Sequence, residues 1–71
     1  MTARERVRTY LRGRGWVSGY ELETHAHEWG YKASNIERRA RELSVERVIE
    51  RRIEKGTVQY REPILKQAQL I

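Results

Sequence analysis

Arg38 and Arg41 are the side chains whose type and spacing first suggest chemistry, because at 100° per residue they point to the same side of a helix. Ser34, Asn35 and Glu42 fall toward the edges of that side. Together these residues offer guanidinium, amide and hydroxyl groups, which is what a helix that reads nucleic acid needs. A solvated helix packed on a small core has the same pattern, so the surrounding sequence must decide.

Residues 34–43 carry strong signals for such a helix. Ser34 and Glu37 have the spacing of a capping box, in which the serine oxygen accepts the Glu37 amide and the Glu37 carboxylate accepts the Ser34 amide. The side opposite the two arginines is apolar and consists of Ile36, Ala40 and Leu43. We therefore expect a helix that begins at Ser34, with Arg39 nearer the core side and the weaker candidate for contact.

The N-terminal segment predicts a first helix. Thr2 and Glu5 form another capping box, and apolar residues then recur at helical spacing until Gly13 interrupts them. These apolar residues are Ala3, Val7, Tyr10 and Leu11. The segment is therefore expected to form about three turns of helix.

A second helix is expected to follow a short extended piece at Trp16 and Val17. Ser18 and Glu21 have capping-box spacing, and the helical pattern continues to about Trp29. Gly30 is expected to end this helix in the left-handed conformation. Only about four residues then precede Ser34, so the two helices are arranged as in a helix-turn-helix unit.

From Val48 onward the apolar period changes from 3.6 to 2, which predicts a β-hairpin around Lys55 and Gly56. A two-residue turn there pairs strand positions in a fixed register. The expected pairs are Ile53 with Val58, Arg51 with Tyr60, Arg52 with Gln59, and Glu50 with Arg61. One face of the hairpin should then be apolar and the other polar.

The composition limits the class of protein. With 71 residues the chain can form one small domain, and its net charge of +5 suggests an anionic partner. It has no cysteine, no apolar run long enough to span a membrane and no signal-peptide pattern, so a cytoplasmic protein is expected. His25 and His27 lack the spacing of a metal site. No nucleophile-and-base pair or phosphate-binding glycine loop is present, so we expect no enzyme, metal, cofactor or small-molecule substrate.

The order helix, short strand, helix, turn, helix and hairpin resembles the winged-helix family of helix-turn-helix proteins. The resemblance covers residues 1–62 and implies an α+β fold, a three-helix winged helix-turn-helix with a C-terminal two-stranded β-hairpin wing. Arg47 departs from it, because such domains often leave the third helix through Gly or Asn. We expect residues 63–71 to form a separate tail, either disordered or a dimer contact. The residues that carry the resemblance are Glu21-Leu22, Ala26, Gly30, Ile36, Arg39, Ala40, Leu43, Val48 to Arg52, Lys55-Gly56 and Tyr60.

The resemblance implies a sequence-specific double-stranded DNA-binding protein, a small transcriptional regulator whose third helix enters the major groove. Asn35, Arg38 and Arg41 would then contact base edges, since Arg can bind guanine and Asn adenine with two hydrogen bonds. The wing would lie along the backbone or in the minor groove. The expected backbone contacts are Lys32, Ser34, Arg52, Lys55 and Arg61.

Two further expectations concern partners. A single module buries only ~600 to 1,000 Å² on DNA, which favours a homodimer on a two-fold site. Glu21, Glu23 and Glu28 argue against DNA if they point toward it, because they would lie on the helix that flanks the duplex. A winged helix that binds protein is therefore the alternative, and an RNA-binding one a smaller possibility.

Overall fold

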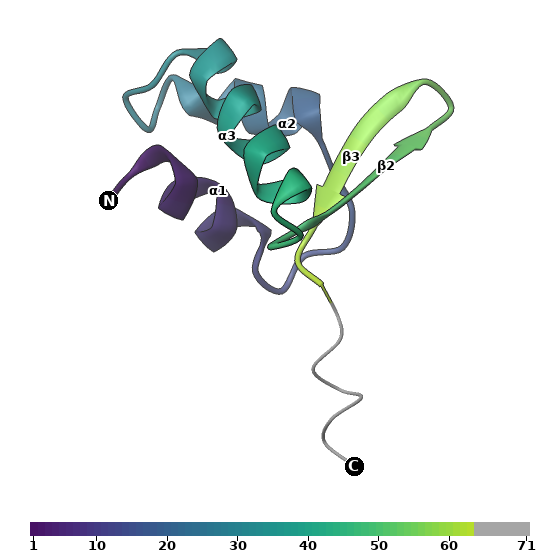
Figure 1. Cartoon of the computed structure of the whole chain (residues 1–71). Helices are drawn as coiled ribbons and strands as arrows, with labels where there is room; N and C mark the ends of the chain where they lie inside the picture. The colour runs from purple at the N-terminus through teal and green to yellow at the C-terminus, as the bar shows by residue number, and fades with distance from the viewer. Residues whose placement is uncertain (64–71) are drawn as a thin grey trace.

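The computed structural model describes residues 1–63, which form an α+β domain of three helices and a three-stranded antiparallel sheet (Figure 1). Its elements are α1 (Ala3–Leu11), β1 (Val17–Ser18), α2 (Gly19–Ala26), α3 (Ala33–Val45), β2 (Glu50–Glu54) and β3 (Thr57–Arg61). In this described range, no helix is long and apolar enough to cross a membrane. The expectation for the tail falls, apart from Pro63, on residues 64–71 and lies outside the described residues.

All three helices and the sheet contribute to one apolar core. The stripe predicted on α3, Ile36, Ala40 and Leu43, is at most 1% exposed. The other fully or nearly buried core residues are Ala3, Val7, Leu11, Val17, Leu22, Ala26, Ile49 and Tyr60. Burying an aliphatic side chain contributes about 1.5 to 3 kcal/mol, so this stripe fixes which side of α3 faces outward.

The capping box predicted for the first helix is confirmed, and of the one predicted for the second helix only the Ser18 half is present. The Glu5 amide donates to Thr2 Oγ1 at 3.1 Å, and the Thr2 amide donates to Glu5 Oε1 at 2.7 Å. The hydrogen bond that the Glu5 carboxylate accepts from the Thr2 amide, followed by the Thr2 side chain, lowers the pKa of the Glu5 carboxyl below its usual value. At α2 the Glu21 amide donates to Ser18 Oγ at 3.0 Å, which makes Ser18 the N-cap.

The capping box predicted at Ser34 is wrong. α3 begins one residue earlier, at Ala33, with Lys32 as an extended N-cap and no side chain capping the helix. The Ile36 amide already donates to the Lys32 carbonyl at 3.1 Å, so Ser34 lies inside the first turn. The start of α3 is therefore determined by where the preceding turn ends and not by the capping preference of Ser34.

That preceding turn has Gly30 at its centre, in the left-handed conformation expected, with φ of +86°. The Tyr31 amide donates to the Ala26 carbonyl at 2.9 Å and the Gly30 amide to the His27 carbonyl at 3.0 Å. These two bonds are those of a Schellman motif. The regular part of α2 ends at Ala26, earlier than the expected Trp29, because the motif uses the carbonyls of the last turn.

Arg47 ends α3 in the same way, although it is not glycine. Its φ is +66°, its amide donates to the Ser44 carbonyl at 3.1 Å, and the Val48 amide donates to the Leu43 carbonyl at 2.9 Å. The departure noted in the sequence is therefore a non-glycine residue in a position that glycine prefers. A side chain in this conformation costs roughly 1 to 2 kcal/mol.

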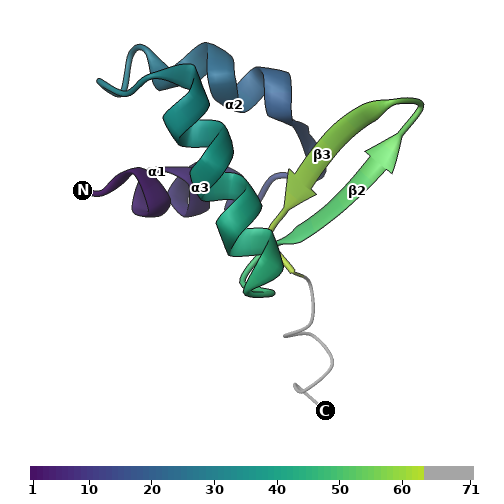
Figure 2. The same cartoon turned by 45° about the horizontal axis from the view of Figure 1, so that its top comes forward.

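All four predicted cross-strand pairs of the hairpin are confirmed, and Lys55 and Gly56 both have positive φ, 51° and 80°. The expectation of two strands is incomplete, because β1 pairs with β3 and gives the order β1-β3-β2. The apolar face is also less complete than expected. Ile53 is 62% exposed, since the end of the hairpin projects beyond the helices (Figure 2).

Replacing Arg47 by glycine should stabilise the domain, because glycine adopts the left-handed backbone conformation without strain. Glycine also raises the conformational entropy of the unfolded chain, which offsets only part of this stabilisation. We expect Arg47→Gly to raise the free energy of unfolding by roughly 0.5 to 1 kcal/mol, or about 4 °C in melting temperature. The same change at Arg38, inside α3, should lower stability by about 1 kcal/mol. Thermal and urea unfolding measure both, and an unstable Arg47→Gly protein would contradict the strain argument.

Candidate nucleic-acid interface

The outward side of α3 is an exposed stripe made of Ser34, Arg38, Arg41 and Val45. These residues follow one another at spacings of four, three and four, which keeps them on one line along the helix. Figure 2 shows α3 at the front of the domain with the hairpin projecting to one side. The helix therefore presents its length, free of covering elements in the described part of the chain, to a partner.

The two arginines of this stripe differ in their surroundings. Arg41 donates to Glu37 Oε2 at 3.2 Å, one turn earlier on the same helix. Arg38 has no ion pair or side-chain hydrogen bond with any of residues 1–63. Arg38 is thus the freer of the two cations, whereas Arg41 is held by a neighbouring carboxylate.

Asn35 and Arg39 lie on the edge of α3 away from Glu37, and both are less exposed than the stripe. Arg39 donates to Glu42 at 3.1 Å, its side chain is 27% exposed, and its Nε is buried without a hydrogen-bond partner among the described residues. Arg39 therefore lies nearer the core, as expected, and serves the packing of α3. Asn35 is half-buried at the margin of the outward side.

The start of α3 is suited to an anion. Lys32 and Ser34 are both exposed there, and no side chain caps the helix. The first amides of an uncapped helix point outward and carry the positive end of the helix dipole. A phosphate can accept hydrogen bonds from such amides, and Lys32 adds a full charge beside them.

Arg52 and Arg61 lie elsewhere, on the face of the sheet opposite the helices, where both guanidinium groups stack on Trp16 at 4.4 Å from its ring centre. Arg61 also donates to Glu50 at 2.5 Å and Arg52 to Gln59 at 2.6 Å. The structure therefore places Ser34, Asn35, Arg38 and Arg41 along α3, with Lys32 at its N-cap, but holds Arg52 and Arg61 against the sheet. Lys55 is exposed at the turn of the hairpin.

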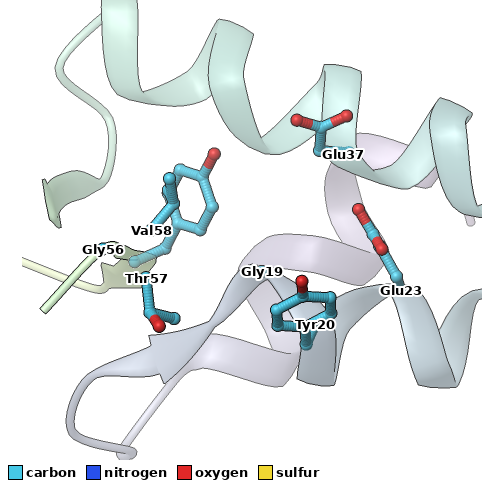
Figure 3. Close-up of a pocket in the computed structure, with 8 residues that line it drawn as sticks. Gly19, Tyr20, Glu23, Glu37, Gly56, Thr57 and Val58 are labelled. Carbon is cyan, nitrogen blue, oxygen red and sulfur yellow. The ribbon is translucent and has the colours of Figure 1, made fainter. Parts of the chain in front are cut away.

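A groove between α2, α3 and the hairpin is lined by residues that the sequence analysis did not assign to a functional site (Figure 3). Glu37 enters it from α3 and Glu23 from α2, with Tyr20 and Val58 beside them. Glu37 could have been recognised from its spacing of four residues before Arg41, which favours an ion pair. The capping-box interpretation assigned that carboxylate to Ser34 instead.

Of the three acidic residues of the α2 region, only Glu23 lines this groove. Glu21 accepts a short hydrogen bond from the Tyr10 hydroxyl, which raises the pKa of Tyr10, and Glu28 contacts His25 Nδ1 at 2.7 Å. Glu21 and Glu28 are therefore engaged with the side chains between α1 and α2. The acidic charge near α3 is smaller than the sequence of α2 suggests.

An ion pair between Arg4 on α1 and Glu46 at the end of α3 connects these two helices. Arg4 donates to both carboxylate oxygens of Glu46, at 2.7 and 3.1 Å. The Arg4 guanidinium lowers the pKa of the Glu46 carboxyl, and the Glu46 carboxylate raises the pKa of Arg4. Both side chains are solvent-exposed, so the pair orients α1 against α3 more than it stabilises the fold.

Comparison of the chain with protein-family models, curated proteins and solved structures found no match. Among residues 1–63, no three histidine, cysteine or acidic side chains come together as metal ligands would. The geometry of the α3 surface is therefore the basis for any functional conclusion.

The stack of Arg52 and Arg61 on Trp16 should hold the hairpin to the domain. Replacing Trp16 by leucine keeps an apolar side chain but removes both cation–π contacts, so unfolding should become easier by about 1 kcal/mol or more. Hairpin amides, including those of Arg52 and Gln59, should exchange faster with deuterium. The control is Arg51→Ala on the other face of β2, which should change exchange little. Unchanged stability and exchange in Trp16→Leu would contradict this role.

Proposed function

We propose that the protein is a winged-helix protein that binds double-stranded DNA sequence-specifically, as a small transcriptional regulator, with α3 in the major groove and the β2–β3 hairpin as the wing on the backbone or in the minor groove. The single observation that carries the proposal is the exposed stripe of α3, on which Arg38 has no partner within residues 1–63. A free guanidinium on an uncovered helix matches the donor needed for guanine.

Three residues of α3 are the proposed base readers. Arg38 would bind guanine O6 and N7 with two parallel hydrogen bonds, and Asn35 would bind adenine N6 and N7 from the margin of the same side. Arg41 would contact a second guanine while it stays in reach of Glu37, from which its guanidinium now lies 3.2 Å. An α-helix fits the width of the major groove, which allows all three to reach base edges together.

The proposed backbone contacts fall into two groups. Lys32, Ser34 and the uncapped amides of α3 would bind a phosphate at the helix start, and Lys55 would bind another from the tip of the hairpin. Arg52 and Arg61 form the second group, with their charge close to the sheet because both stack on Trp16. We expect this second group to contribute less than Lys55.

DNA binding is tested by titrating random and selected duplexes with the protein at two salt concentrations. Affinity should fall with salt at a slope of roughly −0.9 per neutralised phosphate. Arg38→Ala should cost about 1 to 3 kcal/mol on a selected site and relax the preference at one base pair, whereas Lys55→Ala should weaken all sequences equally. No salt-dependent binding at low salt would refute the proposal, and equal loss from both variants on every sequence would refute the assigned roles.

We further propose that the protein binds as a homodimer on a two-fold site, because one such module buries too little DNA surface for tight specific binding. Sedimentation of the protein alone and with a selected duplex should give a mass of two chains per duplex. A palindromic selected site, with half-sites about one helical turn apart, should accompany this result. One chain per duplex in both experiments would contradict the dimer.

A protein-binding domain is the second candidate, and one observation favours it. Tyr20, which lines the groove of Figure 3, is 76% exposed, and Ile53 on the nearby hairpin is 62% exposed. Exposed apolar side chains beside a groove are common where a protein partner binds. The salt titration separates the two candidates, since a protein-binding domain shows no salt-dependent affinity for duplex DNA.

A further inference from the structure

Glu37 is the acidic residue of α3 that contacts Arg41, one of the proposed base-reading arginines. Its side chain is 41% exposed and accepts a hydrogen bond from Arg41 at 3.2 Å. It lies one turn before Arg41 on α3 and lines the groove between α2, α3 and the hairpin, where Figure 3 shows it on the wall formed by α3. A protein that bound phosphate only through its total charge would gain nothing from a carboxylate at this position.

The chemistry of a carboxylate limits what Glu37 can contact on DNA. An ionised carboxylate only accepts hydrogen bonds, so it is repelled by phosphates and by the acceptor atoms of guanine and thymine. Adenine offers an amino group but presents its N7 acceptor beside it, whereas the cytosine N4 amino group has no acceptor next to it on the same base. Cytosine is therefore the base edge that an ionised glutamate tolerates best.

The pair with Arg41 adds a second constraint. Guanine O6 and cytosine N4 of one base pair lie side by side in the major groove, so an arginine and a carboxylate in contact can bind the two bases together. Arg41 has five N–H donors, and the bond to Glu37 leaves others free for guanine. Because Glu37 fixes the guanidinium from one side, it also limits the directions in which Arg41 can reach.

We propose that Glu37 is a specificity-determining residue, which selects a G·C base pair by accepting from cytosine while it positions Arg41 on guanine and repels other sequences. This inference rests on the proposed DNA-binding function and names the base pair that α3 would select. Its alternative is a surface ion pair that supports only the helix, as residues four apart often do. The proposal and this alternative differ in whether the base preference of the protein depends on the charge of Glu37.

The test uses the full chain with Glu37→Gln, which keeps the size of the side chain and removes the charge. Wild-type and variant proteins are each used to select bound duplexes from a random pool, and affinities are then measured on the selected site and on a duplex with the G·C pair replaced by A·T. Wild-type protein should prefer G·C, and the variant should lose about tenfold of that preference. The affinity of the variant for unrelated duplexes should rise, because the negative charge that the phosphates repel has been removed.

Glu23→Gln is the matched control, because Glu23 lines the same groove from α2 and is not paired with a base-reading arginine. It should raise the affinity for all duplexes by a similar factor and leave base preference unchanged. A further variant, Glu37→Gln combined with Arg41→Gln, separates positioning from direct contact. Compared with Arg41→Gln alone, the double variant should keep the same G·C preference if Glu37 acts only by positioning Arg41, and should lose more of it if Glu37 also contacts cytosine.

Two outcomes overturn the inference. Equal effects of Glu37→Gln and Glu23→Gln on every duplex, with unchanged base preference, would show that Glu37 contributes charge alone. Absence of duplex binding by the wild-type protein at low salt would overturn the proposed function and this inference together. Binding that needs Arg38 but does not depend on Glu37 leaves the proposed function standing and refutes the inference alone. Circular dichroism and thermal melting of each variant confirm that it is folded.

Discussion

Two left-handed residues, one before and one after α3, set the position on which the rest of the surface depends. Gly30 reverses the chain so that the helix starts at Ala33, and Arg47 turns it out so that β2 begins at Glu50. Both turns use the same pair of Schellman hydrogen bonds. Because the two ends are fixed and one stripe is buried, the helix has no freedom to rotate, and Arg38 and Arg41 must face outward.

The charge of the protein is less available than its total suggests. Many of the arginines are engaged within the fold: Arg4 with Glu46, Arg39 with Glu42, Arg41 with Glu37, and Arg61 with Glu50. Exposed ion pairs contribute little to stability, so their main effect here is to decide which cations remain free. Those without a charged partner within residues 1–63 include Lys32, Arg38 and Lys55. These three lie at the start of α3, on its outward side and at the hairpin turn. Arg6 and Arg8 on α1 and Arg47 and Arg51 also lack a charged partner in that range, so the unpaired charge includes the surface proposed for DNA but is not confined to it.

The sequence predicts most of this fold because its strongest signals are local. The Thr2 cap, the Gly30 turn and the hairpin register each depend on a few neighbouring residues, and all three are confirmed. The start of α3 could not be predicted. Ser34 has the local spacing of a capping residue, but the preceding turn ends so that the helix already begins at Ala33. The sequence predicts a short extended piece at Trp16 and Val17, and β1 is found one residue later, at Val17–Ser18. Its pairing with β3 is beyond local reasoning, because the two strands are far apart in the sequence.

In the candidate site, too, helical periodicity predicts some features, whereas others depend on tertiary packing. Helical periodicity is enough to place Arg38 and Arg41 outward and Arg39 toward the core. It could not show that Arg52 and Arg61 stack on Trp16, because that contact joins a loop residue to two strands far away in sequence. Nor could it show that Glu37 faces Glu23 across a groove, which requires the angle between α2 and α3. The charges that would set affinity in the proposed function can thus be identified from the sequence, whereas the arrangement that would set specificity depends on how the helices and hairpin pack.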